Sequence, residues 1–196
     1  MYLPYLKLDL REHFRSLHKK KEKIVPASQA IMILSILNKY AQVDSAAIQK
    51  VLNYSAMTIS RAFRELSEHG FAELRKKNKI NHLEFSKEGK ELFYMAKSVL
   101  SSPVVKEYWL KEEIKGYKLF YAGISALSEY SMIASPSNRE YAIDKKIWNK
   151  ISQQDRIKEL IEPEQTESNI KLQIWNYSPE INKEQNIVDK YSLYLS

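Results

Sequence analysis

The sequence contains no cysteine, and only four of its 196 residues are glycine and four are histidine. Without cysteine the chain forms neither a disulfide nor a thiolate metal site, which is typical of the reducing cytoplasm, where we expect the protein. The histidines show no metal-ligand pattern such as H-E-x-x-H, and four dispersed glycines do not build a phosphate-binding loop. The sequence therefore predicts no bound metal and no cofactor.

Long apolar runs and catalytic motifs are also missing. No stretch approaches the roughly 18 to 20 consecutive apolar residues that cross a bilayer, and the N-terminus lacks the layout of a signal peptide. We therefore expect no membrane contact. The segment from Gly123 to Leu127, GISAL, approaches the nucleophile motif G-x-S-x-G but lacks its last glycine. We predict that the protein is not an enzyme.

Charge is abundant but unevenly distributed along the chain, whose net charge is +7. Residues 1–102 contain 18 Lys and Arg against 10 Asp and Glu, a net charge of +8, whereas residues 103–196 contain 13 against 14, a net charge of −1. Such asymmetry favours a polyanion-binding module joined to a neutral one, although a basic surface is often just a solvated surface. Pro103 follows a helix-breaking Ser-Ser pair, so we predict two domains, residues 1–102 and 103–196.

The first domain is predicted to be mainly helical. Amphipathic spacing indicates a helix over residues 8–23, and Pro26 opens an aliphatic helix over residues 27–40. Asp44 is the expected N-cap of a third, short helix, which ends near Asn53 because asparagine tolerates the left-handed conformation.

A fourth helix and a hairpin follow. Ser55 is the expected N-cap of this helix, and Gly70 is the residue expected to end it. Two segments that alternate between apolar and polar residues then flank the turn at residues 77–79. Ser86 is predicted to cap a further helix that continues to Leu100. The hairpin is expected to place four residues on one apolar face: Ala72, Leu74, Leu83 and Phe85.

This order of elements resembles a known DNA-binding fold. The residues that carry the resemblance are SAMTISRAFRELSEHGFAEL, then RKKNKIN, then FSKEGKEL. They are similar to the DNA-binding domain of bacterial winged-helix regulators, including the multiple-antibiotic-resistance (MarR) family, over roughly residues 26–100. The wing of that family usually carries an Asp-Arg pair, whereas this turn has Lys-Asn-Lys. The expected fold class is α+β, with an N-terminal winged helix-turn-helix domain followed by a smaller mixed α/β domain.

The fourth helix has a polar face that suits the major groove of double-stranded DNA. In a helix-turn-helix the second helix contacts base edges mainly through its N-terminal half. Arginine bonds guanine there, threonine meets the thymine methyl group, and the helix N-terminus holds a phosphate. The buried face is predicted to contain Ile59, Ala62, Phe63 and Leu66. The candidate DNA-binding residues on this helix are Ser55, Met57, Thr58, Ser60, Arg61 and Arg64.

A competing interpretation pairs the charges of this helix with one another. Arg61 with Glu65 and Arg64 with Glu68 are both spaced i,i+4, as in ion pairs on a solvated helix face. The basic hairpin favours DNA contact, because a wing at this position meets phosphates or a minor groove. The candidate wing contacts are Arg75, Lys76, Lys77 and Lys79.

The second domain is predicted to mix helices and strands. We expect a helix over residues 111–133, strands near residues 140–143 and 169–177, and a polar helix over residues 148–161 between them. The last nine residues suggest either a truncated chain or a C-terminal strand. The first helix is expected to carry a core stripe of Tyr117, Phe120, Tyr121, Ile124 and Leu127.

One stretch of this domain, from Tyr117 to Ile143, resembles the C-terminal domain of abortive-infection (AbiEi-type) antitoxins, in which a helix carrying G-x-x-A-L precedes a loop and a strand. The resemblance implies an autorepressor that binds its own promoter and opposes a nucleotidyltransferase-like toxin encoded beside it. We therefore expect a DNA-binding transcriptional regulator, with the antitoxin-like autorepressor ahead of a ligand-responsive regulator. A protein-interaction module on a winged-helix scaffold is the competing hypothesis. Because many winged-helix regulators dimerise, a homodimer is also expected.

Overall fold

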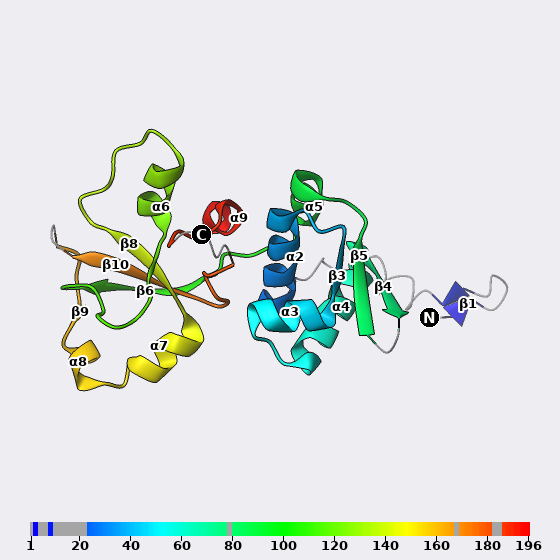
Figure 1. The fold of residues 1–196 in the computed structure, drawn as a ribbon, viewed down its shortest axis with the longest axis horizontal. Helices are drawn as coiled ribbons and strands as arrows, with labels where there is room; N and C mark the ends of the chain where they lie inside the picture. Colours follow the sequence, from blue (N-terminus) through cyan, green and yellow to red (C-terminus); the bar gives the residue numbers. More distant parts are fainter. Residues whose placement is uncertain (1, 4–7, 10–22, 78–79, 167–168, 182–185) are drawn as a thin grey trace.

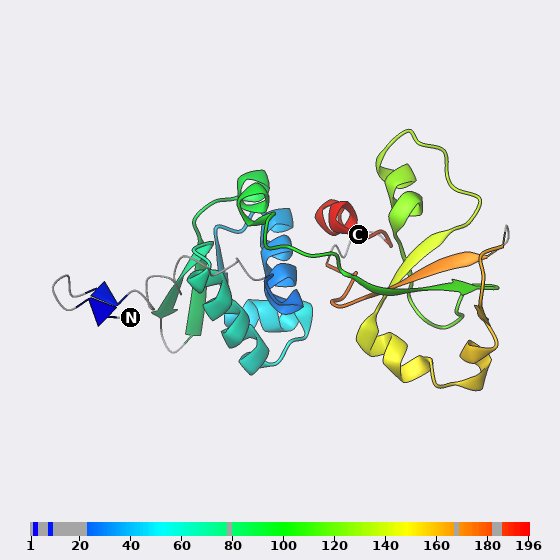
Figure 2. The same cartoon turned by 180° about the vertical axis from the view of Figure 1, so that it is seen from behind.

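The computed structural model describes residues 2–3, 8–9, 23–77, 80–166, 169–181 and 186–196. These residues form a mixed α+β fold (Figure 1). A three-stranded sheet is built from residues 42–85, and a five-stranded sheet is built from residues 104–175. The two sheets with their helices lie side by side along the longest axis of the molecule (Figure 2).

The chain begins with two antiparallel strands of two residues each, β1 (Tyr2–Leu3) and β2 (Leu8–Asp9). The helix expected over residues 8–23 is therefore wrong at Leu8 and Asp9, while residues 10–22 lie outside the described residues. The sequence LKLDL alternates strictly between apolar and polar residues around β2, and a period of two fits a strand better than a helix.

Helix α2 (Pro26–Asn38) is the centre of the first half. Pro26 occupies its first turn, as expected, because the missing N–H has no helical partner there. The helix ends at Lys39, which has a φ of 53°. Most of its side chains are buried, which explains why its sequence is aliphatic on nearly every side.

The two expected caps that follow α2 are confirmed. The Asp44 carboxylate accepts the Ala47 N–H at 2.7 Å and begins α3 (Ser45–Leu52), which ends at Asn53 with a φ of 52°. Ser55 caps α4 (Ala56–Glu68). The predicted buried face of α4 is also confirmed, with four residues that are fully buried: Ile59, Ala62, Phe63 and Leu66.

Gly70 ends α4 as predicted, and its φ of 76° shows why glycine stands there. The Gly70 N–H donates to the Ser67 carbonyl at 2.9 Å, and the Phe71 N–H donates to the Leu66 carbonyl at 3.0 Å. These two bonds form a Schellman motif, in which the buried side chains of Leu66 and Phe71 accompany the turn.

The expected hairpin consists of β4 (Ala72–Lys77) and β5 (Ile80–Phe85). Its register places Ala72 opposite Phe85 and Leu74 opposite Leu83, so the predicted apolar face is confirmed, although Leu74 at its edge is 38% exposed. A third strand, β3 (Gln42–Asp44), pairs with β5 and was not predicted. With three residues it is too short to show alternation in the sequence.

The prediction that Ser86 caps a helix is wrong. The Ser86 hydroxyl donates to the Phe71 carbonyl at 2.9 Å, and the Ser86 N–H donates to the same oxygen at 3.0 Å. Ser86 therefore closes the open end of the hairpin. The next helix, α5 (Gly89–Ala96), begins three residues later and ends before the expected Leu100.

The second half has a central five-stranded sheet in the order β7-β8-β10-β6-β9. Strands β8 and β10 run parallel, and the other neighbours are antiparallel. The strands are β6 (Val104–Leu110), β7 (Phe120–Tyr121), β8 (Glu140–Asp144), β9 (Ile161–Glu162) and β10 (Ile170–Trp175). Those near residues 140–143 and 169–177 were predicted.

Helices cover both faces of this sheet (Figure 1). One face carries α6 (Gly123–Tyr130) and α9 (Lys190–Leu195). The other carries α7 (Lys145–Ile151) and α8 (Asp155–Lys158), which replace the single polar helix expected there. Because α9 is a helix, the expected C-terminal strand is wrong. The Asp189 carboxylate begins it by accepting the N–H groups of Tyr191 and Ser192, both at 2.9 Å.

The helix expected over residues 111–133 is also wrong outside α6. Gly116 and Gly123 have φ values of 86° and 49°, which interrupt helical backbone, and β7 between them pairs with β8. The expected core stripe is consequently divided. Phe120 and Tyr121 pack into the hydrophobic cores, but three members are substantially exposed: Tyr117 at 38%, Ile124 at 49% and Leu127 at 41%.

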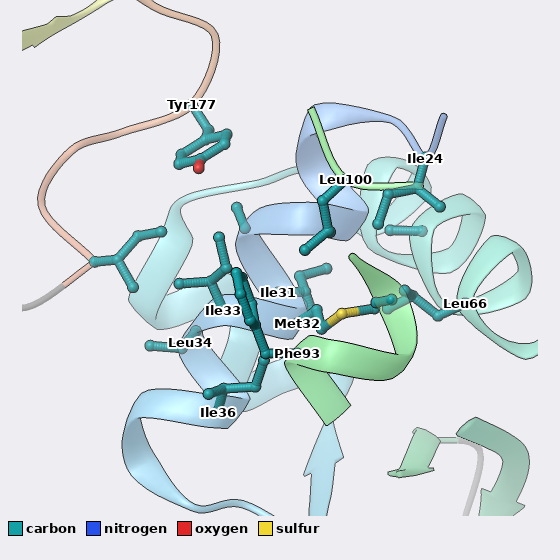
Figure 3. Close-up of a cluster of buried hydrophobic side chains, with 14 of the residues drawn as sticks. Ile24, Ile31, Met32, Ile33, Leu34, Ile36, Leu66, Phe93, Leu100 and Tyr177 are labelled. Atoms are coloured by element: carbon teal, nitrogen blue, oxygen red, sulfur yellow. The ribbon is translucent and has the colours of Figure 1, made fainter. Parts of the chain in front are cut away.

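A buried polar connection joins the two halves. Gln29 of α2 donates from Nε2 to the Ser101 carbonyl at 2.7 Å and lies 3.3 Å from the Tyr177 hydroxyl. That hydroxyl is 2.9 Å from Ser192 Oγ of α9. Figure 3 shows Tyr177 pointing toward α2, next to a core that includes Ile33 and is continuous between the halves.

We predict that Tyr177→Phe lowers the free energy of unfolding by about 1–2 kcal/mol, because the buried Gln29 and Ser192 lose a shared partner. Urea denaturation followed by circular dichroism measures this change. Tyr94→Phe is the matched control, since Tyr94 is 68% exposed. Equal stabilities of the two variants would contradict the assigned role of the Tyr177 hydroxyl.

Candidate nucleic-acid interface

Helix α4 presents a polar face to solvent. Its buried face packs on α2, α3 and the hairpin, which leaves Met57, Arg61 and Arg64 exposed on the opposite side. Met57 is 64% exposed. Thr58 and Ser60 are half-buried on the flanks. The structure therefore brings these candidates together on one helix surface.

Ser55 and Thr58 bond to each other at the start of α4. The Ser55 hydroxyl accepts the Thr58 N–H at 3.1 Å and lies 2.9 Å from Thr58 Oγ1. The first N–H groups of a helix have no partner within it, and an exposed N-terminus attracts anions. The backbone N–H groups of Ala56 and Met57, rather than the Ser55 hydroxyl alone, are thus the donors at this end of α4 that suit an anion.

Glu65, the i,i+4 partner expected for Arg61, bonds to another helix instead. Its carboxylate oxygens accept the Val25 N–H, both at 3.2 Å, and the Ser28 hydroxyl at 2.5 Å. Val25 is the N-cap residue of α2 and has no side-chain oxygen, so the hydrogen bonds at this end of α2 go to Glu65 of α4, through the Val25 N–H and the Ser28 hydroxyl. Neither Arg61 nor Arg64 forms an ion pair with any residue that the structure describes.

The four candidates on the hairpin differ in their surroundings. Arg75 forms ion pairs with Glu73 at 2.7 Å and with Glu84 at 3.1 Å, which raise the pKa of Arg75 and offset its charge locally. Lys76 and Lys77 are exposed and unpaired within the described ranges, and Lys79 lies outside them. Arg75 is therefore the least available cation of the hairpin, because its strand neighbours already bind it.

Helix α7 of the second half adds basic residues that sequence reasoning missed. Lys145, Lys146 and Lys150 are exposed, and Lys146 Nζ lies 5.3 Å from the ring centre of Tyr54, directly before the α4 cap. A groove of about 600 Å³ runs between the α3–α4 turn and α7. Burial, followed by the charge of Asp144, raises the pKa of Tyr54 to about 12. The cluster was missed because the net charge of −1 over residues 103–196 does not show where the basic residues gather.

These elements lie on the same side of the molecule. Figures 1 and 2 both show α7, α3, α4 and the turn end of the hairpin along its lower edge. The exposed cations of these elements, which we call the basic edge, are Arg61, Arg64, Lys76, Lys77, Lys145, Lys146 and Lys150. Exposed cations of this kind attract polyanions.

The structure gives less support to a metal site or a membrane-spanning helix. Across the described ranges, no group of three or more His, Asp or Glu side chains is arranged to hold a metal ion. Nor does any helix in that part of the chain have the length and apolar character needed to cross a membrane.

No protein-family model, curated protein or solved structure matches the chain.

We predict that Glu65→Ala lowers the free energy of unfolding by about 1–3 kcal/mol, because the N-terminus of α2 loses a charged acceptor. Glu68→Ala on the exposed face of α4 is the control and should change stability by less than about 0.5 kcal/mol. Chemical denaturation measures both. If Glu65→Ala were as stable as the control, Glu65 would not be the cap of α2.

Proposed function

We propose that the protein is a DNA-binding transcriptional regulator whose first half acts as a winged helix. In this proposal α3 and α4 are the helix-turn-helix, α4 enters the major groove, and the β4–β5 hairpin is the wing. The observation that supports it most is that α4 exposes two arginines, Arg61 and Arg64, neither of which forms an ion pair within the part of the chain that the structure describes. For Arg61 the reason is that its i,i+4 partner, Glu65, is bonded to α2.

Each part of the basic edge has a role in the proposal. Arg61 and Arg64 bond guanine edges in the major groove, and Thr58 contacts a thymine methyl group, with Met57 and Ser60 beside them. The α4 N-terminus holds a backbone phosphate next to Ser55. Lys76, Lys77 and the α7 lysines bind phosphates on either side of the α4 contact. These contacts fix the register of the protein on the duplex but carry no sequence information.

Within this function, we favour an autorepressor of the antitoxin type. Its support is the order of elements after Gly123, where α6 carries G-x-x-A-L and is followed by a loop and β8, as in AbiEi-type antitoxins. Co-expression with a nucleotidyltransferase-like toxin encoded beside the gene tests this role. Rescue of growth supports an antitoxin, whereas growth arrest with the intact protein present contradicts it and leaves a ligand-responsive regulator or an interaction module.

Arg61→Ala should weaken binding to a selected genomic fragment by about 1–3 kcal/mol and reduce its preference over unrelated DNA, because a base contact is lost. Fluorescence anisotropy with the selected and an unrelated duplex measures both affinities. Arg139→Ala, which removes an exposed arginine of the second half paired with Glu113, is the control. An unchanged preference in Arg61→Ala would show that α4 does not read the sequence.

Lys77→Ala should instead weaken binding to all sequences alike and reduce the salt slope of log K by about 1, because one phosphate contact is lost. Lys146→Ala should have the same effect if α7 lies along the backbone. Anisotropy titrations over a series of salt concentrations provide the slopes. A slope identical to that of the unaltered protein would remove the altered lysine from the interface.

A further inference from the structure

A second concave surface lies on the other side of the five-stranded sheet from α7. It is a groove of about 760 Å³ between α6, α9 and the face of the sheet formed by the inner strands β6, β8 and β10. This volume falls within the range of small-molecule sites, roughly 300–1,000 Å³. The basic edge contributes no residue to its lining. The groove is therefore separate from the proposed DNA interface.

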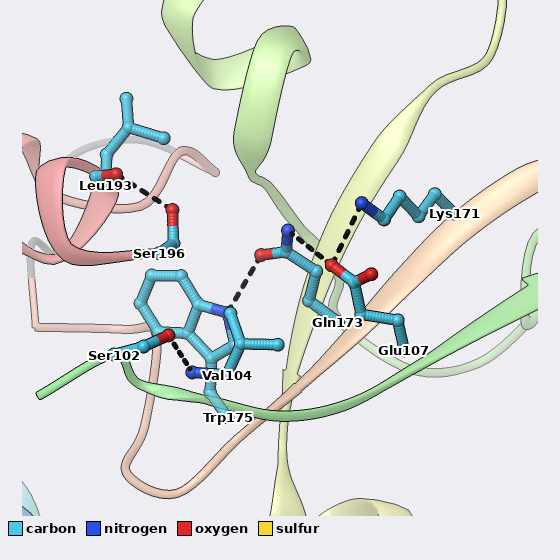
Figure 4. A network of polar contacts seen from close by, with 8 residues as sticks. All are labelled: Ser102, Val104, Glu107, Lys171, Gln173, Trp175, Leu193 and Ser196. Carbon is cyan, nitrogen blue, oxygen red and sulfur yellow. Dashed lines mark hydrogen bonds and ion pairs between the residues drawn. The ribbon is translucent and has the colours of Figure 1, made fainter.

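The floor of the groove is polar and largely satisfied by its own bonds (Figure 4). Lys171 Nζ lies 2.9 Å from Glu107 Oε1, and Gln173 Nε2 donates to the same oxygen at 3.3 Å. The buried Trp175 donates from its indole N–H to Gln173 Oε1 at 3.1 Å. This chain of bonds neutralises Glu107 and Lys171 against each other and holds Gln173 in place.

Two charged groups of opposite sign remain at the groove. Glu140 is half-buried beside Gly123, where an added Cβ would lie only 1.8 Å from Glu140 Oε2. Lys190 is the first residue of α9, with Nζ 4.9 Å from the ring centre of Tyr130. Neither Glu140 nor Lys190 forms an ion pair with a residue placed by the structure.

Burial accounts for the electrostatic state of Glu140. It raises the pKa of the Glu140 carboxyl, and Glu107 adds to it, whereas Lys171 and a hydrogen bond from the Ile124 backbone lower it. A half-buried carboxylate without an ion pair gains stability from an incoming cation, because a charged partner compensates its lost hydration.

The walls of the groove are apolar. Ile124 and Leu127 of α6 are 49% and 41% exposed, and Leu193 of α9 also lines the groove. Apolar walls with a few polar groups between them are usual in small-molecule sites. The groove thus combines apolar walls with an anion, Glu140, and a cation, Lys190, that form no ion pair among the described residues.

We propose that this groove binds a small zwitterion with an apolar body, of the α-amino-acid class with a large apolar side chain. Its ammonium group pairs with Glu140, its carboxylate pairs with Lys190, and its side chain lies against Leu127 and Leu193. A purely cationic or purely anionic ligand would leave one of the two protein charges unpaired. This proposal does not depend on the proposed DNA binding.

Isothermal titration calorimetry of the full chain with L-phenylalanine and L-leucine tests it. We expect saturable binding with Kd in the micromolar to millimolar range, weaker binding of phenethylamine, which lacks the carboxylate, and weaker binding of 3-phenylpropionate, which lacks the ammonium group. Glu140→Gln and Lys190→Met should each weaken L-phenylalanine binding by roughly 10–100-fold. Lys190→Met should also abolish the preference for L-phenylalanine over phenethylamine.

Matched controls separate this site from general charge effects. Glu129→Gln on α6 and Lys115→Met remove the same charges from exposed residues that do not line the groove, and they should leave binding unchanged. Thermal melting checks that each variant is folded. If Glu140→Gln disturbs the start of α6, the test depends on Lys190→Met, because Lys190 is exposed. Absence of binding of both amino acids at about 10 mM overturns the proposal, as does equal affinity for L-phenylalanine and phenethylamine.

Discussion

The bond between the Glu65 carboxylate and the N-terminus of α2 links the fold to the proposed function. Helix α2 begins at Val25 and Pro26, which provide no capping oxygen, so its N-terminus takes one from α4. The same bond fixes α4 against the most buried helix of the first half. It also directs the Glu65 carboxylate away from Arg61, so this acidic group does not offset the charge of Arg61 on the polar face of α4.

A second constraint is the polar connection through Gln29 and Tyr177, which holds the second half against α2. Because the halves share one hydrophobic core, the helices on the two faces of the five-stranded sheet have fixed positions relative to α4. Helix α7 lies next to the α3–α4 turn, while α6 and α9 form a groove elsewhere. The second half therefore contributes to the basic edge and carries a separate concave surface.

Local signals allowed much of the first half to be predicted from sequence. The caps at Asp44 and Ser55, the turn at Gly70 and the alternation in the hairpin act within a few residues, so the sequence contains their causes. Prediction failed where contacts between residues far apart in the sequence compete with local signals. Ser86 bonds the Phe71 carbonyl instead of capping a helix, and β7 pairs with β8 although its spacing was helical. The ion pairs of Arg75 and the position of α7 likewise depend on strand register and tertiary packing.

The central claim is that α4 reads DNA from the major groove, and methylation interference on a fragment selected from genomic DNA tests it most directly. Guanine N7 lies in the major groove and adenine N3 in the minor groove, so dimethyl sulfate distinguishes them in one experiment. The account predicts that methylation at particular guanine N7 atoms blocks binding, and that Arg61→Ala removes this interference at one of them. Interference only at adenine N3, or failure to select any fragment, would contradict it.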